Sequence, residues 1–522
     1  MTHLPILPIL IPMMTGALLL FFKEKRHGRR AFIALLSLGG QLAVAVMLLL
    51  QANAQAAGSI AVYTLGNWPA PFGIVLVADR LAAIMLTLTA TLGLATLIYA
   101  LARWERAGSH FLPLMQFLLM GLNGAFLTGD LFNLFVFFEV LLAASYGLAL
   151  HGSGLMRVKA GMHYIVVNLV ASALFLIAAA LLYGILGTLN MADMAQRLAQ
   201  LSAADRRIFD LGALLLGIVF LVKAGAWPFN FWLPAAYSAA AAPVAGVFAI
   251  LTKVGVYALL RFSVLWQEAD APAPFEGDWL FYCGLVSIAL GSIGVLASQK
   301  LDRMACFLVI TSSGTLLAAF GFPGTTLTSP ALYYLVGSVL GSAAFFMLIE
   351  MAERERSTTA DLLAISLDAF GIDEPHEAAP ADERPGVVIP AAMAFLGLAF
   401  FSCTLILTGL PPFPGFVAKF ALMKAAIAAP PAAPALQAWL FFAAQLISGL
   451  AGLIGLSRLG IRVFWDSQRP VPHLQWLEAG PVAALVLLCL GLSFGAGQAM
   501  AYFDAASASL HEVSHYVEAV LP

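Results

Sequence analysis

Long apolar stretches dominate the chain, and short polar or charged segments separate them. A stretch of about 18 or more apolar residues can cross the hydrocarbon core of a bilayer as a helix. Strands of a transmembrane barrel would alternate between apolar and polar residues over about ten positions, and these stretches do not alternate. The pattern therefore predicts an all-α, polytopic membrane protein with about fourteen transmembrane helices.

The predicted helices follow the apolar stretches, and their ends are approximate. They cover residues 4–22, 31–51, 73–101, 111–129, 131–150, 162–187, 209–240, 243–264, 279–298, 304–321, 329–351, 389–428, 437–463 and 479–500. Two of them, 209–240 and 389–428, are too long for one straight span and contain prolines near their middle, so we expect both to be discontinuous. The residues expected at the breaks are Gly225, Pro228, Pro411, Pro412 and Pro414.

Basic residues gather on alternate loops, which predicts the orientation of the chain in the membrane. If the N-terminus lies outside, the inside loops hold 17 of the 26 lysines and arginines, by a count along the sequence. An even number of crossings then places both termini outside. The long polar loop 352–388 is expected to face the cytoplasm.

Two short similarities predict an internal repeat. Residues 164–175 resemble 334–345, and residues 225–229 resemble 409–413. A unit of five helices is odd, so the second unit would enter the membrane from the opposite side and the repeats would be inverted. Discontinuous helices at matching positions of inverted repeats point to the ion path of a transporter. The predicted organisation is three N-terminal helices in 1–110, a first five-helix repeat in 111–264, a linking helix in 265–303, a second five-helix repeat in 304–463, and a last helix with an outer tail in 464–522.

Four ionisable side chains lie far inside predicted helices: Glu139, Lys223, Lys253 and Lys419. A charge at the centre of a membrane helix costs about 2.5–3.5 kcal/mol, and one carboxylate cannot neutralise three lysines, so structural ion pairs explain the set poorly. Burial favours the neutral form of a lysine and a nearby carboxylate favours its charged form. A movement of Glu139 would therefore make Lys223 hold or release a proton, and the broken helices would leave room for water beside the lysines. His163, near the inside end of its helix, either extends this path or is an interfacial histidine.

Composition narrows the class of protein further. Residues are 61% apolar and 10% charged, against about 25% charged in an average soluble domain, which excludes a large soluble enzyme. The net charge is −2 and basic residues do not interleave with aromatic ones, so nucleic acid is not an expected ligand. The four cysteines lie in apolar stretches without a CxxC pair, so no disulfide framework, metal cluster or cofactor is expected.

One motif points to a different class of protein. Residues 511–515, His-Glu-Val-Ser-His, match the zinc-protease signature H-E-x-x-H. Catalysis would also need a third ligand and a substrate cleft, and the motif lies within the last dozen residues, after the last predicted helix. A short amphipathic tail is the preferred interpretation, and no metal site is predicted.

Four segments resemble the antiporter-like membrane subunits: 131–139, 222–234, 251–257 and 409–419. That group comprises the Mrp/Pha multisubunit cation/proton antiporters, the proton-pumping subunits of respiratory complex I and the membrane-bound hydrogenases. The similarity extends over nearly the whole chain. The length and the lysine at 419 are most similar to the D subunit of the Mrp/Pha antiporters, whereas a complex I subunit that resembles the chain has glutamate there.

The resemblance implies roles for the buried charges. Glu139 and Lys223 would form the controlling ion pair, Lys253 the central relay and Lys419 the far-side relay. The family often has lysine near the position of His163, which leaves the role of this histidine open.

The resemblance also implies partners and a place in the cell. The chain would be one of six or seven different subunits of a complex that exchanges protons for Na⁺ or K⁺ across a bacterial cytoplasmic membrane. The alternative is a proton-pumping subunit of complex I or a related hydrogenase. The sequence does not distinguish Na⁺ from K⁺, because it shows no motif for an all-oxygen cation site.

Overall fold

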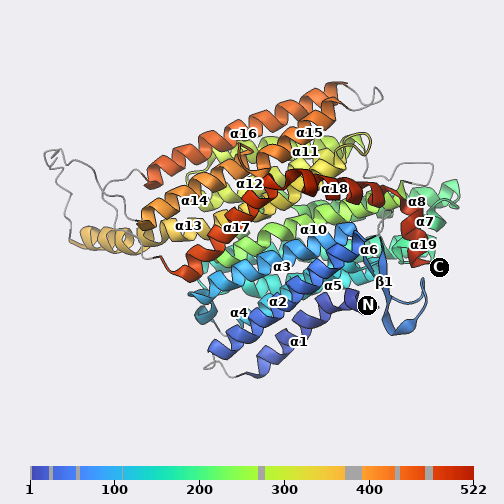
Figure 1. Cartoon of the computed structure of the whole chain (residues 1–522), viewed down its shortest axis with the longest axis horizontal. Coiled ribbons are helices and arrows are strands. Elements are labelled where there is room, and N and C mark those ends of the chain that lie inside the picture. The colour runs from blue at the N-terminus through green and yellow to red at the C-terminus, as the bar shows by residue number, and fades with distance from the viewer. Residues whose placement is uncertain are drawn as a thin grey trace.

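The computed structural model describes residues 3–22, 27–54, 59–108, 110–267, 277–370, 391–428, 435–464 and 474–521, with only the backbone described in 355–370. Part of the predicted polar loop, residues 371–388, lies outside the described residues, as do the basic residues of 23–26. Long helices run side by side through the molecule (Figure 1). Twelve helices among the described residues are long and apolar enough to cross a membrane. The predicted all-α, polytopic fold is therefore confirmed.

The N-terminal part of the chain, up to Ala107, contains the helices that lead to the first predicted repeat. It comprises η1 (Leu4–Ile6), α1 (Leu7–Phe21), α2 (His27–Ala52), β1 (Ala61–Thr64), η2 (Leu65–Asn67), β2 (Val75–Ala78), α3 (Arg80–Leu101) and η3 (Trp104–Ala107). We predicted a helix from residue 73, but β1 and β2 pair antiparallel with Ala61 opposite Ala78. The helix α3 begins only after Asp79, whose side chain accepts a hydrogen bond of 2.8 Å from the Ala82 amide and so caps the first turn.

The middle of the chain contains the first interrupted helix and the most deeply buried one. It comprises α4 (Phe111–Leu127), α5 (Leu131–Ala149), α6 (Leu155–Leu186), α7 (Met191–Leu198), α8 (Ala203–Ala224), η4 (Asn230–Trp232), α9 (Leu233–Ala239) and α10 (Ala242–Trp266). The central helix is α10, which packs against α3, α8, α12 and α13 and is buried at every residue from Pro243 to Trp266.

The last part of the chain contains the second interrupted helix and the tail. It comprises α11 (Asp278–Ala297), α12 (Leu301–Phe320), α13 (Thr328–Phe370), α14 (Ala391–Thr408), α15 (Pro414–Ile427), α16 (Ala435–Phe464), α17 (Trp476–Phe494), α18 (Ala496–His511) and α19 (Val513–Val520). The helix α13 continues 19 residues past the predicted end at 351, because residues 352–370 contain no glycine or proline and many good helix formers.

The helix count and the repeat remain predictions. The twelve long helices do not include α4, which is shorter, or the interrupted pair of α8 and α9. The helix α4 occupies one of the two remaining predicted positions, and the pair of α8 and α9 occupies the other. Residues 304–463 contain nearly all of α12, then α13, the pair of α14 and α15, and α16. A second unit of five helices therefore needs α11 as its first member, and α11 packs along α12 as α4 packs along α5.

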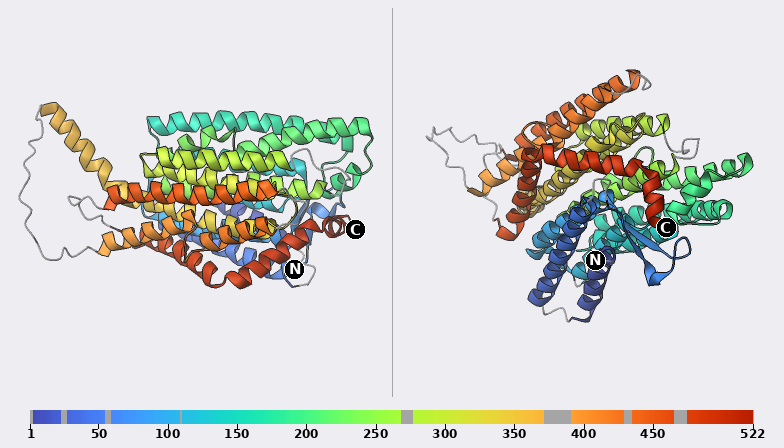
Figure 2. Two further views of the ribbon diagram at one scale, coloured as in Figure 1. Left: turned by 90° about the horizontal axis from the view of Figure 1, so that it is seen from above. Right: turned by 45° about the vertical axis from the view of Figure 1, so that its right-hand side comes forward.

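The described ends of the chain lie at the same end of the helix bundle (Figures 1 and 2), whereas α13 projects beyond the opposite end. This arrangement agrees with an even number of crossings. Instead of a simple tail, the chain ends in α18 and α19, which pack on α3, α13 and α7. Phe503, Leu510 and Tyr516 are buried in this contact.

Candidate functional site

The first interruption places Lys223 at the end of a half-helix. The helix α8 ends at Ala224, and Gly225 adopts a left-handed conformation with φ of +62°. The chain then turns through η4 before α9 begins. Trp232 in η4 donates a hydrogen bond of 3.2 Å to the backbone carbonyl of Val222, so one carbonyl freed at the end of α8 is satisfied. Lys223, in the last turn, is only 8% exposed.

The side chains of Lys223 and Glu139 contact α6 and not each other. The ammonium of Lys223 donates a hydrogen bond of 3.2 Å to the side-chain oxygen of Asn168. Glu139, which is half-buried on α5, accepts a hydrogen bond from the hydroxyl of Ser172. The carboxylate is close enough to interact electrostatically with Lys223, but no ion pair joins them among the salt bridges of the described residues. The controlling ion pair implied by the resemblance therefore remains a prediction.

Lys253 is the most deeply buried of the three lysines. It lies in the middle of α10, is 2% exposed, and donates a hydrogen bond of 3.0 Å to the hydroxyl of Ser313 on α12. Further hydroxyls line α12 beside it. Ser312 donates to Ser338 at 3.0 Å, and Thr315 accepts a long hydrogen bond of 3.4 Å from Gln445 on α16. These contacts connect α12 to α10, α13 and α16 through neutral polar side chains.

The second interruption places Lys419 after the break. The helix α14 ends at Thr408, Gly409 has a φ of +82°, and α15 begins at Pro414. Lys419 is buried on α15 and donates a hydrogen bond of 3.1 Å to the backbone carbonyl of Thr408. The side chain thus reaches back across the break to the C-terminus of α14. Both interruptions lie at the prolines that mark the long predicted helices.

His163 does not lie with Glu139 and the three buried lysines. It is exposed on α6 and lines an open pocket of about 740 Å³. Polar residues of three elements share this pocket, namely Lys159, Ser238, Lys300, Asp302 and Arg303. Trp232 also lines the pocket and contacts the carbonyl next to Lys223 in sequence. The pocket therefore approaches the first break from the surface.

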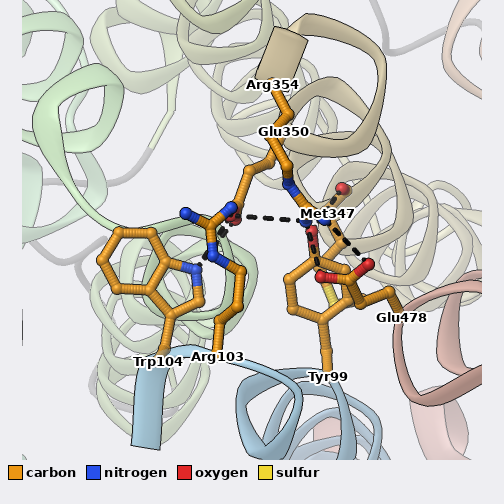
Figure 3. A network of polar contacts seen from close by, with 7 residues as sticks. All are labelled: Tyr99, Arg103, Trp104, Met347, Glu350, Arg354 and Glu478. Carbon is orange, nitrogen blue, oxygen red and sulfur yellow. Dashed lines mark hydrogen bonds and ion pairs between the residues drawn. The ribbon is translucent and has the colours of Figure 1, made fainter. Parts of the chain in front are cut away.

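A charged network lies beside a second pocket (Figure 3). Glu350 on α13 accepts a hydrogen bond of 3.0 Å from the Trp104 indole and lies 3.7 Å from Arg354. Arg354 also forms a 2.6 Å ion pair with the fully buried Glu478 of α17. The network joins η3, α13 and α17, and the second pocket, of about 310 Å³, shares Ser238 and Asp302 with the first.

The residues of the zinc-protease motif do not lie on one helix. Glu512 has a φ of −92° and a ψ of 72°, and separates α18 from α19. His511 contacts the hydroxyl of Thr328 at 3.2 Å, and burial lowers the pKa of its imidazole. Within the described ranges, no group of three or more His, Cys, Asp or Glu side chains is arranged to hold a metal ion. The motif lacks the helical geometry that the zinc signature requires.

Sequence reasoning missed the neutral hydrogen-bond partners of Glu139, Lys223 and Lys253. Asn168, Ser172 and Ser313 carry no charge, so none of them stands out in an apolar stretch as a lysine or a glutamate does. One signal was present, because Tyr164, Asn168 and Ser172 are spaced four apart and so share one face of α6.

Comparison with known proteins identifies the family. A family model described as "NADH:quinone oxidoreductase/Mrp antiporter, TM" matches residues 128–367. The chain is 50% identical over 532 residues to a protein of Rhizobium meliloti (strain 1021) named as the D subunit of a probable K(+)/H(+) antiporter, covering 99% of this chain and 97% of that protein. It is 34% identical over 529 residues to the D subunit of a Na(+)/H(+) antiporter of Bacillus subtilis (strain 168), covering 100% of both.

Solved structures share the fold. A chain of the Mrp complex from Dietzia sp. DQ12-45-1b matches with a TM-score of 0.81 at 24% identity, covering 100% of this chain and 99% of that one. A chain of respiratory complex I from Thermus thermophilus matches with a TM-score of 0.74 at 20% identity, covering 99% and 100%. The fold likeness is thus broad, whereas the relatives that are 50% and 34% identical over the full length are both named as antiporter D subunits. The chain therefore belongs to the D-subunit family of the multisubunit antiporters.

Proposed function

We propose that the chain is the D subunit of a multisubunit antiporter that exchanges protons for Na⁺ or K⁺, and that protons pass along Glu139, Lys223, Lys253 and Lys419. The observation that carries this proposal is the burial of three lysines, each 8% exposed or less, on three different helices. Each ammonium donates to a neutral acceptor, on Asn168, Ser313 or Thr408. A buried lysine without a carboxylate in contact can release its proton and accept another.

The pocket lined by His163 is the proposed inlet, because it leads from the surface to the turn after Lys223. The relay would then pass to Lys253 in the central helix and along the hydroxyls of α12 toward Lys419. Protons require groups that can both donate and accept, and hydroxyls such as those of Ser313 and Thr315 meet that requirement.

The cation is Na⁺ or K⁺. The relative that is 50% identical is named as part of a K(+)/H(+) antiporter, and those at 33–34% identity are named as parts of Na(+)/H(+) antiporters. K⁺ is therefore the first cation to test. The alternative function, a proton-pumping subunit of complex I, has weaker support, because that likeness concerns the fold at 20% identity.

The proposed setting is a bacterial cytoplasmic membrane, with both termini outside and several different antiporter subunits as partners. The fold shared with a chain of the Mrp complex supports such partners. A reporter fused after the last residue is expected to read as external. A cytoplasmic reading would mean an odd number of crossings and would overturn the inverted repeat.

The decisive experiment measures K⁺-driven and Na⁺-driven proton movement in membrane vesicles that contain all partner subunits. Lys253→Ala is expected to abolish proton movement per assembled complex. Lys424→Ala is the matched control, because Lys424 is exposed on α15 and can keep its charge at the surface. Normal exchange by assembled Lys253→Ala complexes would overturn the proposed proton path.

A further inference from the structure

The helix α6 presents two polar side chains to the first break, one turn apart. Asn168 is 1% exposed and Ser172 is 6% exposed. They follow Tyr164 on a buried face, whereas Val166, Leu169 and Val170 on the other side of the helix are exposed. An amide or a hydroxyl in a membrane helix is costly unless it is hydrogen-bonded, whether it faces lipid or the interior of the protein. Their partners therefore indicate what they do.

The amide of Asn168 is held in one orientation. Its nitrogen donates a hydrogen bond of 2.9 Å to the backbone carbonyl of Tyr164, which leaves the oxygen to accept from Lys223 at 3.2 Å. The flipped amide would place an NH₂ group, which only donates, against an ammonium, which also only donates. Asn168 is therefore built to accept from Lys223.

Ser172 serves the other member of the pair. Its hydroxyl donates to a carboxylate oxygen of Glu139, and hydrogen bonds to a charged oxygen are stronger than those between neutral groups. One helix thus supplies an acceptor for the lysine and a donor for the carboxylate. Both charges are satisfied while they stay apart.

We infer that Asn168 and Ser172 are positioning residues that stabilise the separated state of Glu139 and Lys223. The inference rests on the proposed function and on the expectation that movement of Glu139 toward or away from Lys223 makes this lysine hold or release its proton. If the pair closed without competition, the ammonium and the carboxylate would hold each other and the proton would stay. The α6 side chains offer each charge a second partner, so that opening the pair leaves no buried charge unsatisfied.

The first test removes the two side chains one at a time. Ser172→Ala is expected to slow exchange about tenfold per assembled complex, the ratio for losing one hydrogen bond to a charged group. Ser172→Thr keeps the hydroxyl and is expected to restore most of the rate. Asn168→Ala is expected to slow exchange by a similar factor.

The second test changes the chemistry at Asn168 and measures the pH profile. Asn168→Asp places a carboxylate beside Lys223, and in the described structure Glu139 is the other charged group that interacts with this lysine. The remaining exchange is expected to shift to more alkaline pH, because the lysine then releases its proton less readily. Asn168→Ala adds no charge, so its pH profile reports the role of the native amide, and a role in packing alone would leave that profile unchanged.

The matched control is Ser145→Ala. Ser145 on α5 is hydrogen-bonded at 2.8 Å to the hydroxyl of Tyr164 on α6, so its loss weakens the same helix contact without touching Lys223 or Glu139. This variant is expected to keep the wild-type rate per complex and the wild-type pH profile.

The outcomes separate this inference from the proposed function. If Lys223→Ala abolishes exchange while assembled Asn168→Ala and Ser172→Ala complexes keep the normal rate and pH profile, the positioning role is wrong and the proton path stands. If Lys223→Ala itself exchanges normally, the proposed path fails and the inference fails with it. A Ser145→Ala profile that shifts like that of Asn168→Asp would also overturn the inference.

Discussion

The two interrupted helices hold their lysines on opposite sides of the break. Lys223 lies in the last turn of α8, before its break, and Lys419 lies on α15, after its break. In both cases the C-terminus of the first half-helix lies beside the lysine, where free carbonyls favour a cation. Lys419 donates directly to one such carbonyl, that of Thr408.

The breaks differ in the other groups around the lysine. The first has the carboxylate of Glu139 and the amide of Asn168 within reach of Lys223. At the second, no acidic side chain of the described residues forms an ion pair with Lys419, and the hydrogen-bond acceptor is a backbone carbonyl. A backbone carbonyl cannot move away or change its charge, whereas a carboxylate on a neighbouring helix can do so. The first break is therefore suited to control proton uptake, and the second to pass the proton on.

The largest effect is expected at the first break. Glu139→Ala and Lys223→Ala should each reduce exchange by about a hundredfold or more, the scale for losing a side chain that transfers protons. Glu139→Asp should keep part of the activity, because the charge survives with a shorter reach. The measurement is the exchange rate per assembled complex in vesicles.

The same variants distinguish a role in controlling proton transfer from a role in helix packing. Removing one partner of a buried ion pair costs about 3–5 kcal/mol and would lower the amount of complex in the membrane. Because each charge is bonded to α6 in this structure, we expect nearly normal amounts of complex. Assembled variants that exchange at the wild-type rate would remove both residues from the proton path.

The second break should tolerate change better. Lys419→Ala is expected to slow exchange about tenfold, less than the roughly hundredfold or more typical of a side chain that transfers protons directly, because Lys419 is proposed to pass the proton on and not to control its uptake. Lys424→Ala, five residues further along the same helix, should have no effect. If Lys419→Ala lost exchange as completely as Lys223→Ala, the two breaks would control proton transfer equally.

The glycines that end the first half-helices provide a finer comparison. Gly225 and Gly409 both have φ near +60 to +80°, so alanine at either position should cost about 1–2 kcal/mol and lower the amount of complex. An added Cβ at Gly409 would lie 2.6 Å from the Lys419 side chain, whereas one at Gly225 would meet Leu233 instead. Gly409→Ala should therefore also reduce exchange per complex, and Gly225→Ala should not. Equal rates per complex in the two variants would show that the position of Lys419 is not critical.

The sequence predicts the broad fold and the burial of the three lysines well, for a physical reason. Apolar length and proline are local signals, so α8 and α14 end where the glycines and prolines stand. The partners of the charges depend on tertiary contacts, so the bond from Lys223 to Asn168, 55 residues away, could not be read from the chain. The packing of the tail could not be predicted either. Phe503, Leu510 and Tyr516 are buried only because α3, α7 and α13 lie against α18 and α19.

The smallest effect on exchange is expected at the tail, which is distant in sequence from both breaks and contains none of the residues of the proposed proton path. Replacing His511 and His515 together with alanine removes the contact between His511 and Thr328, which joins two neutral groups because burial lowers the pKa of the His511 imidazole. A net contribution of about 0.5–1.5 kcal/mol is typical of such a bond, so the complex should assemble slightly less well and exchange at the wild-type rate. Phe503→Ala is the contrasting variant, because it empties a buried site under α18 and should reduce assembly more strongly. Lost exchange in fully assembled His511 and His515 variants would mean that the tail takes part in transport, and that the comparison of the two breaks omits a third element.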